Sequence, residues 1–326
     1  MARRTAKGPQ SIVVGVDIGA TKIAAAIVSP RGRVGDETVR NRRETDGPEA
    51  VVATIVEATR TTLSKMRGAQ LAAIGVGIAG QVEAESGLIH YSPNLRWENF
   101  PLGDQLRAAF DAQVMVANDV HAALVGEWRH GAGIGELELF MLVVGTGVGG
   151  GAIVGGRLLT GSTNTFGEVG HLTLVAGGRP CHCPNRGCFE AYVGGWAVAE
   201  RARELVAREL EAAEWLVQRA GSIDLITAQT VTQAYREGDP LVATLVRETI
   251  DYLEAGVVGI VNTFNPHRVI LGGGMIQGLP DVVPGIQEAI RRRCQPAAAF
   301  VEVVRARLGE HAAIVGAASL ARERLS

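Results

Sequence analysis

The sequence predicts an α/β fold with two domains, and three observations support this prediction. Short β-rich runs alternate along the chain with helical patterns, which is typical of sheets layered against helices. The chain has 326 residues, of which 47% are hydrophobic, enough for more than one core. A strand, a glycine-containing turn and a second strand follow one another near Gly19 and again near Gly147, which indicates an internal duplication.

The first half of the chain begins with two β-rich runs that a polar, glycine-containing turn joins into a predicted hairpin, Ile12–Val16 and Ile23–Val28. Apolar residues at helical spacing then predict a helix over Glu49–Met66. Strand and helix alternate in the segments that follow: a strand at Leu71–Ile78, a helix at Leu102–Phe110, a strand at Val114–Ala117 and a helix at Val120–Arg129.

The second half repeats this alternation. Two strands are predicted on either side of a glycine-rich stretch, Leu139–Val144 and Ala152–Val154. Long helices are predicted over Trp196–Ala220, ended by Gly221, and over Asp239–Thr263, where Asp239-Pro240 is a typical helix start. A strand at Arg268–Leu271 and a helix from about Ala312 to Arg324 complete the pattern. The layout of the motifs places a domain boundary after residue 118, with residues 119–311 forming a larger second domain.

Composition narrows the classes of function. A net charge of -2 argues against a dedicated nucleic-acid binder, which should be strongly basic. No apolar run approaches the roughly 20 residues of a membrane span. Arg3, Arg4 and Lys7 could open a signal peptide, but Asp17 and Lys22 interrupt the apolar stretch that follows. We therefore expect a cytoplasmic protein that binds neither nucleic acid nor membrane.

Glycine is the unusual component, with 42 residues, and three segments that contain it could bind a ligand. In VGVDIGATK (Val14–Lys22), Gly19 and Thr21 can offer a backbone N–H and a hydroxyl to phosphate, and Asp17 can hold Mg²⁺ through water; an ordinary hairpin explains this segment almost as well. GTGVGGG (Gly145–Gly151) has five glycines directly after a strand, which favours a ligand loop over a tight turn. VILGGGM (Val269–Met275) suits a nucleotide at a helix start.

Asn118 and Asp119 lie where a predicted strand ends and a helix begins. Ligands of open α/β sheets collect at such ends. Asn and Asp are also among the preferred helix caps, so a structural function explains the pair equally well.

Three cysteines lie within eight residues, and with a preceding histidine they form a possible metal site. His171, Cys181, Cys183 and Cys188 supply one nitrogen and three sulfurs, which is a standard structural zinc set. His182 is a competing ligand, and three buried free thiols are the alternative. Such a site would stiffen a loop with Glu168 and Glu190 at its ends. Cys294, in an Arg-rich helical stretch, is expected to be an ordinary thiol.

Together these motifs resemble the ROK family (repressors, open reading frames and sugar kinases), and within it the bacterial ATP-dependent glucokinases. The resemblance covers the chain from about Ile12 to Leu320. It implies an actin-like (ribonuclease H-like) ATPase fold, with two α/β domains around a cleft. It also implies that the C-terminal helix, about residues 312–326, joins the small domain.

The resemblance assigns a function to each motif position. It implies that the phosphates of ATP and the Mg²⁺ are bound by Asp17, Gly19, Thr21, Lys22, Gly145, Thr146 and Gly147, and the adenosine by Gly272, Gly273 and Gly274. It implies sugar binding by Gly80, Asn94, Asn118, Asp119, Glu168, His171 and Glu190, with Asp119 as the catalytic base. It implies a structural Zn²⁺ at His171, Cys181, Cys183 and Cys188, with His171 serving both metal and sugar. Two positions depart from the family pattern, Ala20 and Pro184, each of which replaces a glycine.

The implied reaction is ATP-dependent phosphorylation of a hexose, with glucose phosphorylated at the 6-hydroxyl. Kinases for N-acetylglucosamine, N-acetylmannosamine, mannose or fructose are alternatives, and polyphosphate is an alternative donor. A ROK repressor is a second class, but only eleven residues precede Ile12, too few for a helix-turn-helix. An actin- or chaperone-like ATPase is a third, which the polar sugar set argues against. The resemblance also implies a homo-oligomer, a dimer or a tetramer.

Overall fold

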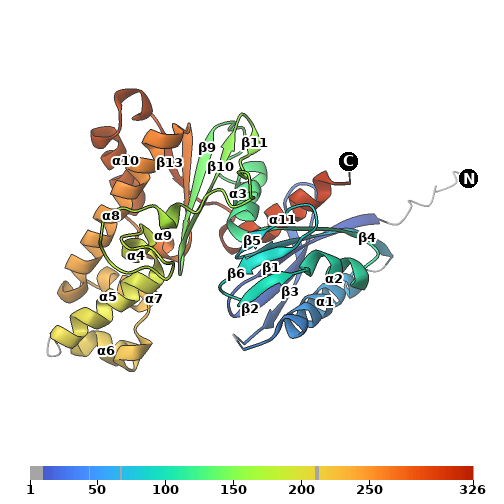
Figure 1. Ribbon diagram of the computed structural model, residues 1–326, viewed down its shortest axis with the longest axis horizontal. Helices are drawn as coiled ribbons and strands as arrows, with labels where there is room; N and C mark the ends of the chain where they lie inside the picture. The colour runs from blue at the N-terminus through green and yellow to red at the C-terminus, as the bar shows by residue number, and fades with distance from the viewer. Residues whose placement is uncertain (1–9, 44, 67, 210–212, 326) are drawn as a thin grey trace, which may run out of the picture. The chain divides into compact units, whose positions relative to one another are not determined.

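The computed structural model describes residues 10–325 apart from 44, 67 and 210–212 (Figure 1). Contacts divide the chain into two compact units. The first unit extends to Gly135 and also contains Thr160–Phe166 and the segment from Arg307 onward. The second unit consists of Glu136–Leu159 and Gly167–Ala306. The predictions about Arg3, Arg4 and Lys7 lie outside the described residues.

The sheet of the first unit has the strand order β3-β2-β1-β4-β8. Its strands are β1 (Gln10–Ile18), β2 (Lys22–Val28), β3 (Val34–Asn41), β4 (Ala69–Ile78) and β8 (Gln113–Asn118). β1 and β2 pair antiparallel, which confirms the predicted hairpin, whereas β1, β4 and β8 are parallel. Ile18 lies beside Ile78, and Ile78 beside Asn118, so the three parallel strands end level with one another.

Helices cover both faces of this sheet, and a small second sheet lies at its end. These elements are α1 (Pro48–Ser64), α2 (Leu102–Ala109), α3 (Asp119–His130), α11 (Ala312–Glu323), the short 3-10 helix η4 (Gly309–His311), and the strands β5 (Gln81–Val82), β6 (Ile89–Ser92) and β7 (Trp97–Phe100). Alternation along β1 divides the core: Val14 and Val16 pack with Ile55 of α1, whereas Val13 packs with Ile314 of α11.

α11, drawn in red among the blue and teal strands, packs with its backbone directly on its neighbours (Figure 1). A Cβ on Gly75 of β4 would lie 1.9 Å from the carbonyl oxygen of Ala317, and one on Gly316 would lie 1.6 Å from that of Ala122 in α3. Glycine at these positions is therefore required by the close approach. Because α3 packs on α11, the predicted boundary between residues 118 and 119 lies inside the first unit.

The second unit repeats the topology of the first, with the strand order β11-β10-β9-β12-β13. Its strands are β9 (Leu139–Val144), β10 (Val148–Val154), β11 (Arg157–Leu158), β12 (Arg268–Gly272) and β13 (Glu302–Arg305). Here too the first three strands form an antiparallel hairpin series, and β12 and β13 run parallel to β9. This agreement of order and direction confirms the internal duplication.

In the chain, the helices of the second unit lie between β11 and β12 and between β12 and β13. They are η1 (Val169–His171), α4 (Glu190–Val193), α5 (Gly195–Arg208), α6 (Glu214–Ala220), η2 (Ile223–Leu225), α7 (Ala228–Arg236), α8 (Pro240–Phe264), α9 (Gly274–Gly278), α10 (Val282–Arg293) and η3 (Pro296–Ala298). α8 begins as predicted, since the carboxylate of Asp239 accepts a hydrogen bond from the backbone N–H of Leu241 over 2.8 Å.

Two predictions for the second unit were wrong. The single helix over Trp196–Ala220 is two helices, because Glu209 leaves the helical backbone region (φ −130°, ψ 55°); residues 210–212 lie outside the described residues. The strand predicted at Ala152 begins at Val148, because Gly149 and Gly150 pair with Val143 and Leu142 of β9. The turn between β9 and β10 is therefore only Gly145–Gly147.

Across the described residues, no helix has the length and apolar character needed to span a membrane.

Candidate functional site

Several predicted site residues of the first unit gather at the carboxyl ends of its parallel strands. Asp17 lies one residue before the end of β1, Gly80 follows β4, and Asn118 ends β8. These strands are neighbours in register, so the three residues lie along one edge of the sheet. This edge is where ligands of open α/β sheets bind.

Asn118 links two elements of this edge. Its side-chain oxygen accepts hydrogen bonds from the backbone N–H groups of Val120 (2.9 Å) and His121 (3.1 Å), which caps α3. Its side-chain nitrogen donates to the carbonyl oxygen of Gly80 over 3.2 Å. Asn118 is therefore the helix cap, and its amide also fixes the Gly80 turn. Asp119 is the first residue of α3, where the helix dipole favours an ionised carboxylate.

Asp17 is in an unfavourable position for a negative charge. Burial raises its pKa to about 7, and the charge of Asp119 contributes in the same direction; Lys22 opposes this shift. A divalent cation beside Asp17 would relieve the repulsion, and carboxylate oxygens are ligands that Mg²⁺ prefers. The residues at this edge therefore fit a magnesium ion.

The turn between β1 and β2 is held by a residue that the sequence analysis did not identify. Arg42, only 6% exposed, donates through Nη1 to the carbonyl oxygens of Gly19 (3.2 Å) and Ala20 (2.5 Å). Its backbone N–H donates to the carbonyl of Thr21 over 2.8 Å. Its Nε and Nη2 atoms are buried without a hydrogen-bond partner among the described residues. Because Arg42 occurs in the run RNRR, the sequence gives no signal that separates it from a solvent-exposed arginine.

The remaining predicted residues of the first unit are more exposed. Lys22 forms an ion pair with Glu310 over 2.7 Å. Ala20 is exposed and is not among the described residues with positive φ, so its Cβ is accommodated without backbone strain. Asn94 lies exposed in the turn between β6 and β7.

In the second unit, the start of α5 holds the turn Gly145–Gly147. The backbone N–H groups of Gly195 and Trp196 donate to the carbonyl oxygens of Gly145 (2.9 Å) and Thr146 (3.1 Å). A Cβ at Gly145 would meet only open space, so packing does not explain this glycine. A glycine there would leave room for a ligand to approach the backbone closely.

Glu190, at the start of α4, also contacts this turn. One of its carboxylate oxygens, Oε2, accepts a hydrogen bond from the backbone N–H of Val148 over 2.7 Å. The other, Oε1, accepts one from the indole nitrogen of Trp196 over 3.0 Å. A residue predicted to bind sugar is therefore connected to the turn predicted to bind phosphate.

Glu168 and His171 lie at the two ends of η1 and face each other. The Nε2 atom of His171 is 3.9 Å from a carboxylate oxygen of Glu168. Burial raises the pKa of Glu168; His171 opposes this shift and Glu190 adds to it. A Cβ on Gly170 would lie 2.3 Å from the carbonyl oxygen of Val148, so η1 lies close against β10. Glu168 and His171, predicted to bind sugar, are thus positioned against β10, the strand that follows the turn Gly145–Gly147.

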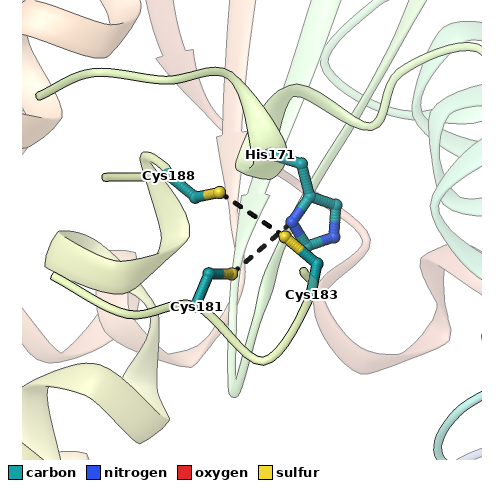
Figure 2. A group of neighbouring side chains, drawn as sticks. All are labelled: His171, Cys181, Cys183 and Cys188. Atoms are coloured by element: carbon teal, nitrogen blue, oxygen red, sulfur yellow. Dashed lines mark hydrogen bonds between the residues drawn. The ribbon is translucent and has the colours of Figure 1, made fainter. Parts of the chain in front are cut away.

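The four predicted zinc ligands lie together (Figure 2), and their donor atoms are all within 4.8 Å of one another. The Sγ atoms of Cys183 and Cys188 are 3.6 Å apart, and the Nδ1 atom of His171 is 3.7 Å from the Sγ of Cys181. A tetrahedral zinc ion with bonds of about 2.0–2.3 Å places its ligands about 3.3–3.8 Å apart, so the residues fit this ion. Burial raises the pKa of the Cys188 thiol to about 12, so without a metal it stays protonated. His182 is not part of the cluster.

Gly272, Gly273 and Gly274 connect β12 to α9. Gly273 has φ 93°, and a Cβ there would lie 2.3 Å from the carbonyl oxygen of Val144. Packing against β9 therefore explains Gly273, whereas Gly274 faces open space.

Comparisons with known proteins agree along nearly the whole chain. The family model described as "ROK family" matches residues 13–324. A glucokinase of Streptomyces coelicolor is 33% identical over 321 residues, which cover 96% of this chain and 98% of that protein.

Two solved structures are similar at the level of the fold and of the sequence. One is a ROK family glucokinase from Streptomyces griseus in complex with glucose and AMPPNP, with a TM-score of 0.84, 33% identity, and coverage of 96% of this chain and 99% of that one. The other is a ROK hexokinase from Thermus thermophilus, with a TM-score of 0.80, 32% identity and the same coverage. These similarities confirm the predicted actin-like, ribonuclease H-like fold.

Proposed function

The chain belongs to the ROK family, and from this premise we propose that it transfers the γ-phosphoryl group of ATP to the 6-hydroxyl of glucose. The observation that carries the proposal is the carboxyl edge of the first sheet, where Asp17 at the end of β1 and Asn118 and Asp119 at the end of β8 lie along one edge, with β4 between them. This edge provides a metal-binding carboxylate, a fixed amide and a candidate base.

Asp119 is proposed as the base. It stands at the first turn of α3, and its carboxylate can accept the proton of a substrate hydroxyl. Asn118, fixed by the cap of α3 and by Gly80, orients the same hydroxyl group. Phosphoryl transfer depends mainly on such positioning and on electrostatic stabilisation, and a catalytic aspartate has the same function in protein kinases.

The two glycine turns are proposed to bind the phosphates of ATP. In the first unit the turn provides Gly19, Thr21 and Lys22. The guanidinium of Arg42 donates hydrogen bonds to carbonyl oxygens of this turn and so fixes it. In the second unit the turn consists of Gly145, Thr146 and Gly147, and Gly272–Gly274 are proposed to line the adenosine. Asp17 would hold Mg²⁺, which would supply positive charge to offset that of the phosphates.

Glu168, His171 and Glu190 of the second unit are proposed to form hydrogen bonds with the hydroxyl groups of the sugar. Gly80 and Asn94 of the first unit are proposed to bind the same sugar. The arrangement of the His171 ring supports a double function, because Nδ1 faces the cysteines and Nε2 faces Glu168. Zinc at the cluster would have a structural function and would fix this ring. We further propose a homo-oligomer, a dimer or a tetramer, which light scattering of the purified protein would test.

A panel of sugars tests the proposal. Turnover with ATP is measured in a coupled assay for glucose, mannose, fructose, N-acetylglucosamine and N-acetylmannosamine. We expect the highest kcat/KM for glucose. A higher value for an N-acetylated sugar would replace glucose as the substrate, and phosphorylation of no sugar in the panel would refute the kinase function. Polyphosphate in place of ATP tests the donor.

A further inference from the structure

Trp196, at the start of α5, contacts three parts of the second unit: the turn Gly145–Gly147, Glu190 and the loop that carries the cysteines. Its backbone N–H donates to the carbonyl oxygen of Thr146 over 3.1 Å. Its indole N–H donates to Oε1 of Glu190 over 3.0 Å. Its ring stacks on the imidazole of His182, with centroids 3.9 Å apart and planes inclined by 21°. One residue therefore connects the three elements: its backbone contacts the turn Gly145–Gly147, and its side chain contacts Glu190 and the loop that carries the cysteines.

Glu190 extends this connection to the far side of the same turn. Its second carboxylate oxygen accepts the backbone N–H of Val148 over 2.7 Å. A Cβ at Gly147 would lie 2.6 Å from that oxygen, so the carboxylate fills the space beside the turn. The turn is thus held on both sides of Gly147, at Thr146 by the backbone of Trp196 and at Val148 by the carboxylate to which Trp196 donates.

His182 connects the indole to the metal cluster. It lies between two of the cluster residues, Cys181 and Cys183, and is not itself a cluster member. Metal coordination fixes both neighbours, and therefore the backbone that carries the imidazole. Without metal, the cluster side chains keep weak contacts such as the 3.6 Å approach of two sulfur atoms. The loop then depends on backbone hydrogen bonds such as that from Cys181 to Asn185 over 3.3 Å, so the stacking partner of Trp196 loses part of its support.

We propose that Trp196 is a positioning residue through which the metal content of the cluster determines the geometry of the turn Gly145–Val148 and of Glu190. The inference rests on the proposed function for the identity of the ligand at this turn, ATP. It predicts that metal in the loop strengthens nucleotide binding, although no cluster residue needs to touch the nucleotide.

Two pairs of variants test the inference. W196F removes the indole N–H. W215F is its control, since Trp215 lies on α6 with its ring beside Arg219 of the same helix. H182A removes the stacking ring, and H182F restores a flat ring without nitrogen atoms. H182A and H182F also keep the inference testable if W196F fails to fold, because His182 is exposed.

The measurements are zinc content by elemental analysis, tryptophan emission, and the affinity for AMPPNP by calorimetry, each before and after treatment with a chelator. We expect one zinc per chain in all four variants. In the wild type, W215F and H182F, we expect chelation to change the emission and to weaken AMPPNP binding about tenfold, the size of one good hydrogen bond. In W196F and H182A, AMPPNP binding should already be weaker with zinc bound, and chelation should change it less than about twofold.

The outcomes that contradict the inference are separate from those that contradict the proposed function. Wild-type protein without zinc, or W196F and H182A with the wild-type dependence of AMPPNP affinity on metal, would overturn the coupling. A double variant W196F/H182A whose two losses simply add would also overturn it, because residues in one connection should not act independently. A metal-dependent affinity in a wild type that phosphorylates no sugar would support the coupling and refute the kinase function.

Discussion

Asp17 and Asp119 repel each other across the carboxyl edge of the first sheet. Burial and then the charge of Asp119 raise the pKa of Asp17 from its ordinary value of 3.8 to about 7. Between these two values the folded protein binds more protons at Asp17 than the unfolded chain does. Stability must therefore fall as the pH rises through this window, and the full loss is present above about pH 7.

Replacing this carboxylate should stabilise the protein and inactivate it. D17N removes the buried charge and is expected to raise the free energy of unfolding by about 1–3 kcal/mol at pH 8. The gain should shrink toward pH 5, where the wild-type carboxyl group is increasingly protonated when folded. Denaturant unfolding of both proteins at the two pH values measures this difference. An equal effect at pH 5 and pH 8 would contradict the shifted pKa.

The base assignment predicts a separate effect on turnover. D119N retains the size of the side chain but cannot accept a proton, so kcat should fall about 10²- to 10⁴-fold while glucose still binds. A coupled assay gives kcat, and calorimetry gives the glucose affinity. D104N is the control, because Asp104 is an exposed residue of α2 that pairs with Arg107. Turnover of D119N close to that of the wild type would exclude Asp119 as the base.

If the cluster binds zinc, replacing one of its cysteines should change the zinc content of the protein, whereas replacing Cys294 should not. C183S should lose zinc, as measured by elemental analysis. C294S should keep it, since the Cys294 thiol lies against the carbonyl of Val258 and is not part of the cluster. H171A should lose zinc and also raise the KM for glucose. An unchanged KM in H171A would refute the double function of this ring.

Replacing Arg42 should weaken nucleotide binding, although no direct contact between Arg42 and a substrate is proposed. R42M leaves the carbonyl groups of Gly19 and Ala20 without their donor, so the turn loses its support and the KM for ATP should rise about tenfold. R40M is the matched control, because Arg40 forms an exposed pair with Glu57 and should change stability by less than about 1 kcal/mol. If R40M and R42M have the same KM for ATP, Arg42 does not support the turn.

Local sequence signals predicted those helices and strands whose first or last residues are typical caps or breakers, such as Asp-Pro, glycine or asparagine. Asp239-Pro240 predicted the start of α8, and apolar runs that end at glycine or asparagine predicted β4 and β8. The interruption at Glu209 could not be predicted, because its surroundings keep a helical pattern of residues. The start of β10 was missed because its glycines look like a loop, although Gly149 and Gly150 pair within the sheet.

The site was predictable where side-chain chemistry is rare along the chain, and not where it depends on packing. The cysteine cluster and the Asn118-Asp119 pair stand out by residue type and position. Arg42 and Trp196 do not, because their importance arises from carbonyl, carboxylate and imidazole partners that only the packing of the fold brings to them. Trp196 lies 50 residues after Thr146 and contacts it only because α5 returns to the turn.

The close packing of α11 also constrains the order in which the two units can fold during synthesis of the chain. Val13, Ala26 and Ala73 on one face of the first sheet are covered by Ile314, Val315 and Ala318, which the ribosome adds only after the whole second unit. The N-terminal sheet is made first, yet this face stays uncovered until translation has passed α11. The second unit, whose segments are all made before α11, can complete its core earlier. A nascent chain can therefore complete the core of the second unit before that of the first, and an apolar face of the first sheet stays uncovered until α11 packs on it.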